Sequence, residues 1–209
     1  MKYLLYIILS LLFIFTVWQY YAANSNKKYN SMNSKKLGHI DNIEFRIYNQ
    51  YSKASVPISN SNMKSANGKF SILAGYIFGG NQDKKSIAMT SPVIYEMKEQ
   101  SYFSFLMPES LTGQEMPKPN NKSIEFNDVV NQYVAVISFP GFANENKVKK
   151  YHTQLKNKLT NLGLNVDDNH IIAIYQPPYQ FIDRINEIWI EINKNDLDGL
   201  FSSNKLKVN

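Results

Sequence analysis

The hydrophobic positions in the middle of the chain follow two different periods. Residues 40–48 alternate strictly between apolar and polar, with Ile43, Phe45 and Ile47 on one face, which is typical of a half-buried strand. Residues 63–77 and 144–162 instead repeat their apolar side chains every three or four positions, which predicts two amphipathic helices. The predicted core face of the first helix holds Met63, Ala66, Phe70, Leu73, Ala74 and Ile77. That of the second holds Val148, Tyr151, Leu155, Leu159 and Leu162.

The order of the predicted elements repeats once along the chain. Further strands are predicted over residues 51–58, 86–97, 101–107, 123–126, 132–139, 170–175 and 187–192. Each half then consists of strands, one helix and two more strands. This order predicts a pseudo-duplicated α+β domain, in which antiparallel strands are wrapped by two helices.

The N-terminal residues form a separate apolar unit. Residues 3–23 carry no charge, and a helix of this length is about 31 Å long, enough to cross a bilayer core of roughly 30 Å. Trp18, Tyr20 and Tyr21 stand at its far end, where aromatic rings favour the lipid–water boundary. We therefore expect a single-pass membrane anchor over residues 1–23.

Two alternatives to an anchor stay open. A cleaved signal segment would export the rest of the chain, although Tyr20 and Tyr21 occupy the −3 positions where a cleavage site prefers small residues. A core helix of a soluble domain is the other alternative. The side of the membrane is undecided as well, because the lysines that follow the segment favour the cytoplasm whereas an N-terminal signal favours export.

Composition divides the remainder of the chain. Residues 24–37 are rich in Asn, Ser and Lys and predict a flexible tether, residues 38–197 form the domain, and residues 198–209 form a polar tail. The domain carries 16 basic and 16 acidic residues, so the net charge of +6 lies entirely in the flanks. A nucleic-acid-binding domain is expected to carry its own basic face, so we expect no nucleic-acid partner. Basic flanks beside an apolar segment favour a membrane surface instead.

The sequence offers no arrangement typical of catalysis. It contains no cysteine, and therefore no thiolate nucleophile or thiolate metal site. It also lacks the nucleophile-elbow, zinc-protease and phosphate-loop motifs. His39, His152 and His170 are far apart in sequence, and we expect His152 to be a solvated flank residue. We therefore predict a protein that is not an enzyme and has no metal site.

Some apolar side chains have no evident role in the core. On the first helix, Ile72 and Tyr76 lie off the predicted core face, beside the small residues Gly68, Ser71 and Gly75. The segment 176–184 adds Tyr179 and Phe181. If this segment folds over the helix, a hydrophobic cleft for a flat ligand results; if it does not, these residues only pack on a loop.

The sequence resembles the SOUL haem-binding protein family. Six segments carry the resemblance and occur in family order over about 150 residues: Ile43–Tyr48, Phe70–Asn81, Ile87–Val93, Phe103–Pro108, Tyr175–Pro178 and Arg184–Trp189. The resemblance implies a distorted antiparallel β-barrel with two flanking helices. It also implies non-catalytic, non-covalent binding of haem or another tetrapyrrole in a shallow cleft between the first helix and the loop after Pro177-Pro178.

The chain departs from the family pattern at polar contacts. Some members carry a histidine, discussed as an iron ligand, at the position of Ile47. Positions that are basic in some members correspond here to Gly68, Tyr76 and Gln180, so Lys64, Lys69 and Arg184 become the candidates for contacting the propionates. The predicted ligand-binding residues are Gly68, Ser71, Ile72, Gly75, Tyr76, Tyr179, Gln180 and Phe181.

Two functional hypotheses follow. The first is a membrane-tethered domain that binds haem or a related tetrapyrrole through apolar contact. The second is a protein-interaction module at the membrane surface without a haem ligand.

Overall fold

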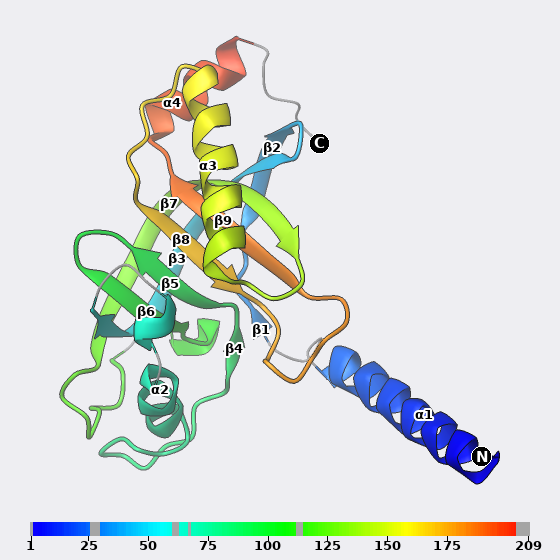
Figure 1. The fold of residues 1–209 in the computed structure, drawn as a ribbon. Coiled ribbons are helices and arrows are strands. Elements are labelled where there is room, and N and C mark those ends of the chain that lie inside the picture. Colours follow the sequence, from blue (N-terminus) through cyan, green and yellow to red (C-terminus); the bar gives the residue numbers. More distant parts are fainter. Residues whose placement is uncertain (1, 26–29, 60–62, 67, 112–114, 204–209) are drawn as a thin grey trace.

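A closed antiparallel β-barrel forms the centre of the protein (Figure 1). The computed structural model describes residues 2–25, 30–59, 63–66, 68–111 and 115–203. The barrel strands follow the order β3-β6-β5-β8-β9-β7, and β7 pairs back onto β3 to close the sheet. Their bounds are β3 (Ile43–Ile58), β5 (Val93–Met97), β6 (Ser101–Leu106), β7 (Glu125–Pro140), β8 (His170–Ile174) and β9 (Ile185–Glu191). The predicted α+β class and antiparallel barrel are confirmed.

Two strands are longer than the sequence pattern predicts. The strands expected over 40–48 and 51–58 are one continuous 16-residue strand, β3. Likewise those expected over 123–126 and 132–139 are one strand, β7. The separate predictions were wrong because β3 and β7 pair with one another from Ile43↔Ile137 to Ser55↔Glu125, across the polar stretches that interrupt the alternation.

The barrel carries additional strands at its edge. β2 (Lys35–Ile40) forms a hairpin with the start of β3, and β1 (Asn30–Ser31) pairs in parallel with β4 (Thr90–Ser91). Paired structure therefore begins inside the segment expected to be a tether, of which residues 26–29 lie outside the described part. The strand expected over 86–97 is divided at Pro92 into β4 and β5 (Val93–Met97).

The helix predicted over 144–162 is confirmed as α3 (Glu145–Asn161). The side chain of Asn144 caps its first turn by accepting the N–H of Lys147 at 3.0 Å. Val148, Leu155 and Leu159 are buried against the barrel, as their spacing predicts. A helix that we did not predict, α4 (Lys194–Ser202), extends into the expected tail, whose residues 204–209 lie outside the described part.

The helix predicted over 63–77 is shorter than expected. Its start is a 3-10 turn, η2 (Met63–Ala66), and α2 covers only Lys69–Ile77. Between them Gly68 has φ +80, a backbone conformation that favours glycine and breaks the helical path. Leu73 and Ile77 are buried as predicted, and Tyr76 is buried as well, whereas Phe70 and the C-cap residue Phe78 are exposed.

The barrel separates two hydrophobic clusters. The larger joins one face of the sheet to α2, α3 and α4, and includes Phe45, Ile137 and Leu155. The smaller lies on the opposite face, which in a closed barrel is its interior, and is centred on Trp189 and Tyr48, whose rings stack at 5.1 Å. Polar residues share this interior, so the lumen is not a purely apolar core.

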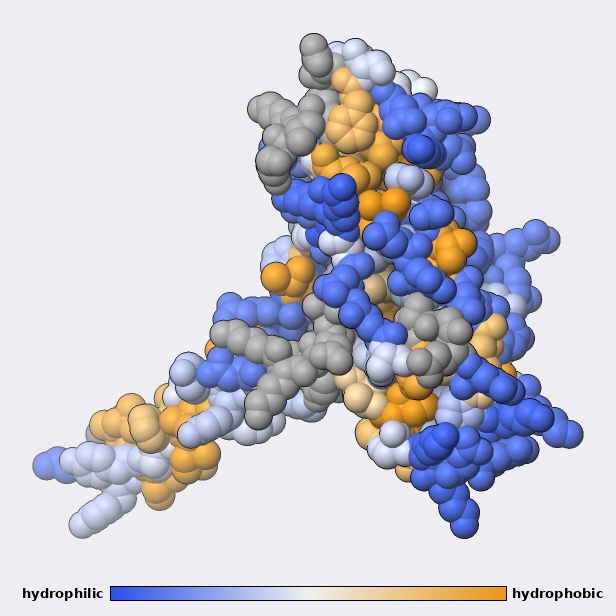
Figure 2. All heavy atoms as spheres, turned by 180° about the vertical axis from the view of Figure 1, so that it is seen from behind, coloured by the Kyte–Doolittle hydropathy of each residue, from blue (hydrophilic) through white to orange (hydrophobic). Residues whose placement is uncertain are grey.

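The N-terminal helix α1 (Lys2–Ser25) projects away from the barrel (Figure 1). Over Lys2–Asn24 it is long and apolar enough to cross a membrane, a property that it shares with signal sequences. Nearly all its side chains are exposed. Figure 2 shows hydrophobic residues gathered along α1, in contrast to the largely hydrophilic surface of the body beside it.

A buried ion pair inside the barrel provides a test of the interior. The ammonium of Lys53 donates to Glu96, and both residues are more than nine-tenths buried. We expect Lys53→Met to reduce the free energy of unfolding by about 3–5 kcal/mol, because it leaves the Glu96 carboxylate poorly compensated. The double variant Lys53→Met/Glu96→Leu should recover most of this loss in urea unfolding. A double variant less stable than Lys53→Met would contradict the assignment.

The same pair predicts a dependence of stability on pH. Burial raises the pKa of Glu96, but the attraction of Lys53 and Lys98 and their hydrogen bonds outweigh burial and hold the pKa below its ordinary value of 4.5. Because the folded-state pKa is depressed, the pair contributes its stabilisation above pH 4.5 and loses it as the pH falls through the folded-state value. Urea unfolding between pH 7 and pH 3 should show a smaller loss for the double variant than for the wild type.

Candidate functional site

An apolar cleft of about 590 Å³ lies between α2 and the loop that joins β8 to β9. We call this loop, residues Gln176–Arg184, the flap. α2 and the flap form the two walls of the cleft, and the barrel strands form its floor. Phe142 and Ala143, which follow β7, complete the lining. The lining residues are Phe70, Ala74, Phe78, Met89, Thr90, Ser91, Val93, Tyr95, Phe103, Phe142, Ala143, Ile174, Tyr175, Gln176, Pro177, Pro178, Tyr179 and Arg184.

One face of α2 forms the first wall of the cleft. Phe70, Ala74 and Phe78 are spaced four residues apart and therefore lie above one another on the helix. The ring of Phe70 also contacts that of Phe105 at 5.2 Å between centroids, so this wall is anchored on the barrel. The wall is apolar and open on its outer side, since Phe70 is 50% exposed and Phe78 is 72% exposed.

The flap forms the opposite wall and is held by Arg184. The guanidinium of Arg184 donates to the backbone carbonyls of Gln176, Pro177 and Gln180, and it lies 4.1 Å from the ring centroid of Phe142. A single side chain thus satisfies three carbonyls of a loop that has no regular structure. Pro177, Pro178 and Tyr179 are thereby held against the cleft.

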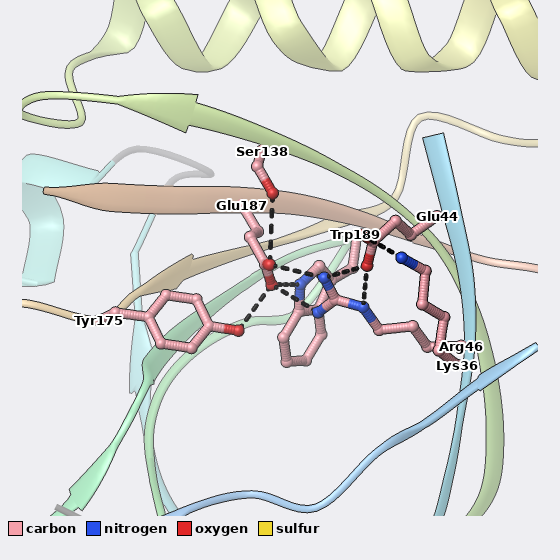
Figure 3. Close-up of polar contacts among 7 residues, drawn as sticks. All are labelled: Lys36, Glu44, Arg46, Ser138, Tyr175, Glu187 and Trp189. Atoms are coloured by element: carbon pink, nitrogen blue, oxygen red, sulfur yellow. Dashed lines mark hydrogen bonds and ion pairs between the residues drawn. The ribbon is translucent and has the colours of Figure 1, made fainter. Parts of the chain in front are cut away.

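Tyr175 connects the cleft to a polar network in the barrel interior (Figure 3). Its hydroxyl donates to the Glu187 carboxylate at 2.6 Å, and the indole N–H of Trp189 donates to the same oxygen at 2.7 Å. The guanidinium of Arg46 donates to both oxygens of Glu187 at 3.0 and 3.2 Å. Burial, together with the negative charge of Glu187, raises the pKa of Tyr175 well above its ordinary value of 10. Tyr175 therefore stays a neutral phenol whose hydroxyl is engaged by Glu187.

Comparison with known proteins supports the assignment that this geometry suggests. The profile of the SOUL heme-binding protein family matches residues 25–191. The chain belongs to this family.

Two named relatives share the similarity. Heme-binding protein 2 of Mus musculus is 32% identical over 135 residues, which cover 61% of this chain and 65% of that protein, slightly under two thirds of its length. Heme-binding protein 2 of Homo sapiens is 27% identical over 162 residues, or 73% of this chain and 78% of that protein.

Solved structures with the same fold are far more distant in sequence. The crystal structure of the EcmrR C-terminal domain superposes with a TM-score of 0.55 at 10% identity, over 73% of this chain and 97% of that chain. A hydrolase from Listeria innocua superposes with a TM-score of 0.50 at 8% identity, over 74% of this chain and 93% of that chain. At this level of identity the likeness concerns the fold alone.

Two of the predicted contact residues, Tyr179 and Arg184, line the cleft of this SOUL protein. The predicted contacts on α2 lie elsewhere. Tyr76 is 1% exposed, its hydroxyl donates to the carbonyl of Pro117 at 3.1 Å, and its ring packs on Phe126 at 5.4 Å. Ile72 is half-buried against the core, and Gly68, Ser71 and Gly75 are exposed but outside the lining.

The remaining predicted contacts hold the flap or lie outside the cleft. Gln180 is buried, and its side chain donates to the carbonyl of Ile182 within the flap. Phe181 lies on the outer side of the flap, with its ring 5.7 Å from that of Phe142. Lys64 is exposed and pairs with Glu145 at 3.7 Å, and Lys69 is absent from the lining. Of the three propionate candidates, only Arg184 lines the cleft.

No histidine lines the cleft among the described residues. His152 and His170 lie instead between α3 and β8, where their rings stack at 4.0 Å between centroids. His152 is only partly exposed and its Nε2 is buried, so the expectation of a solvated His152 was wrong; burial and the neighbouring His170 lower its pKa to about 4. The described residues contain no cluster of three or more metal-ligating side chains.

The cleft residues that the sequence analysis did not predict are mainly apolar, and several are aromatic. Phe70 and Ala74 were assigned to the core face; both line the cleft, and Ala74 also packs against the core. The signal available in the sequence was the glycine itself, followed by apolar residues at 70, 74 and 78. Phe142 had no signal, because its role depends on Arg184, 42 residues further along the chain.

Gly75 lies on an exposed part of α2 that is outside the lining of the cleft. A Cβ built at this exposed helical position meets no atom within 4 Å. We expect Gly75→Ala to raise the free energy of unfolding by about 0.5–1 kcal/mol, because alanine loses less backbone entropy in a helix. Chemical denaturation of the two proteins measures this difference, and a loss of stability would show that the open space at Gly75 is needed.

Proposed function

We propose that this SOUL protein binds haem or a related tetrapyrrole non-covalently in the cleft between α2 and the flap, and that α1 tethers it to a membrane. The observation that supports the proposal best is the cleft itself, whose lining is mainly apolar and includes several aromatic rings. Its volume of about 590 Å³ lies within the range of about 300–1,000 Å³ common for small-molecule sites.

The polar groups of the lining suit binding rather than catalysis. The hydroxyl of Thr90 donates to the carbonyl of Leu106, and that of Ser91 donates to the carbonyl of Tyr175 at 2.9 Å. Both hydroxyls are thus engaged by the backbone, and the described lining offers no histidine to activate them. We therefore propose a non-enzymatic role.

The residues of the lining suit contact with the flat faces of a tetrapyrrole rather than coordination of its metal. Haem, when bound, supplies a redox-active iron and a strong absorption band. Phe70, Phe142 and Pro178 provide flat apolar surface on the walls of the cleft. Met89 is the thioether in the lining, and the phenol of Tyr175 is occupied by Glu187. The affinity is therefore expected to come from apolar contact with the macrocycle.

Membrane tethering is supported by the length and exposure of α1. A bare apolar helix in water would expose a large contiguous hydrophobic surface, which soluble monomers rarely do. A bilayer removes this cost. The proposal therefore keeps α1 attached and places the cleft close to a lipid surface.

A hemin titration with two tryptophan variants of α2 tests the site. Ala74→Trp places an indole inside the cleft, whereas Ser71→Trp places the same indole on an exposed position of the same helix that is outside the lining. We expect Ala74→Trp to weaken hemin binding by roughly tenfold or more, because the indole fills space needed by the ligand. The shift of the Soret band, measured with the full chain in nanodiscs, reports the affinity.

Ser71→Trp is the matched control and should bind hemin as the wild type does. Weakening by Ser71→Trp but not by Ala74→Trp would move the site to the Gly68–Ser71–Gly75 face of α2. A wild-type protein whose response to micromolar hemin matches that of an unrelated membrane protein would argue against the proposal. Capture of a protein partner independent of hemin would then favour an interaction module.

A further inference from the structure

The C-terminal part of α1 is hydrogen-bonded to the tip of the flap, which we define as Tyr179–Ile182. Gln19 is 1% exposed, although it belongs to a helix whose other side chains are almost all exposed. Its side-chain N–H donates to the carbonyl of Tyr179 at 3.2 Å, and its side-chain oxygen accepts the N–H of Phe181 at 2.8 Å. The side-chain amide of Gln19 thus pairs with one backbone carbonyl and one backbone N–H of the flap, as a neighbouring strand would.

Aromatic contacts continue this junction to the cleft. The ring of Phe15 in α1 lies 6.2 Å from that of Phe181, and Phe181 in turn lies 5.7 Å from Phe142 in the cleft wall. In Figure 1 the loop between β8 and β9 is the part of the body that reaches α1. The helix, the flap and the mouth of the cleft therefore form one continuous apolar surface.

The position of the contact along α1 sets the depth of the flap. Phe15 precedes Trp18 by three residues, or about 4.5 Å along the helix axis. In a membrane-spanning α1, Trp18, Tyr20 and Tyr21 would lie at the lipid–water boundary. A flap that contacts Phe15 must then reach this boundary, at the depth of about 5–10 Å to which interfacial elements insert.

The chemistry of the flap suits this environment. Phe181, Ile182 and, just after the flap, Ile185 are each half exposed. The exposed Asp183 limits how deeply the loop can enter, because a carboxylate must stay among the headgroups. Backbone groups at this depth need internal partners, and Gln19 supplies them for Tyr179 and Phe181.

We propose that the tip of the flap is inserted in the bilayer interface beside α1, so that the mouth of the cleft opens at the membrane surface. This inference rests on the proposed tethering by α1. It adds that the partner of the exposed flap is a lipid bilayer. A flat apolar ligand dissolved in the membrane then reaches the cleft without crossing water.

Site-specific labels test the inference directly, since the chain contains no cysteine and any introduced cysteine is unique. Four single variants of the full chain carry an environment-sensitive fluorophore in phosphatidylcholine vesicles: Leu9→Cys in the middle of α1, Phe181→Cys and Ile182→Cys in the flap, and Asn161→Cys at the end of α3. Asn161 is exposed and is the last residue of α3, whose C-terminal end points away from α1 in Figure 1. Lipids brominated near the headgroup or deep in the chains report the depth of each label.

We expect deep quenching at Leu9, shallow quenching at Phe181, Ile182 or both, and none at Asn161. Quenching at Leu9 with both flap labels as water-exposed as Asn161 would overturn the inference and leave the tether intact. An unquenched label at Leu9 would overturn the tether and this inference together. Hemin affinity measured on the same samples reports the proposed ligand separately, because Ala74→Trp blocks the cleft without altering the flap tip.

Discussion

The pairing of β3 with β7 is the constraint on which the rest of the structure depends. These two 16-residue strands are hydrogen-bonded along most of their length and convert an open sheet into a barrel. Closure gives every strand an inner and an outer face, so that Phe45 packs toward the helices whereas Arg46 belongs to the interior. The charged groups of the interior are acceptable because each has a partner: closure brings Arg46 beside Glu187 across β7, and Lys53 meets Glu96 across β6.

Closure also explains why the cleft lies where it does. The strands that end near the flap leave Tyr175 at the rim, with its ring toward the cleft and its hydroxyl on Glu187. The flap itself contributes no ladder hydrogen bonds, so its shape depends on the contacts of Arg184. The guanidinium of Arg184, which the family resemblance suggested as a partner for a ligand carboxylate, thus donates to backbone carbonyls instead. The walls of the cleft are therefore mainly apolar.

Much of the fold was predictable from local pattern, and much of the site was not. The spacing of Val148, Leu155 and Leu159 predicted α3 closely, because local periodicity and burial agree there. The site depends on contacts between residues that are distant in sequence. Tyr76 is buried whereas Phe78, just after α2, is exposed, and the local run of apolar residues does not distinguish the two. Gln19 is an isolated polar residue in an apolar run, and nothing local indicates that its partners lie some 160 residues away.

The junction between Gln19 and the flap would make the cleft sensitive to loss of the N-terminal segment. A peptidase that cut the chain after Ala23 would remove not only the apolar leader but also the amide that pairs with Tyr179 and Phe181 and the ring that packs on Phe181. A form without this segment would lack these contacts, and the flap beside the cleft would lose its support from α1.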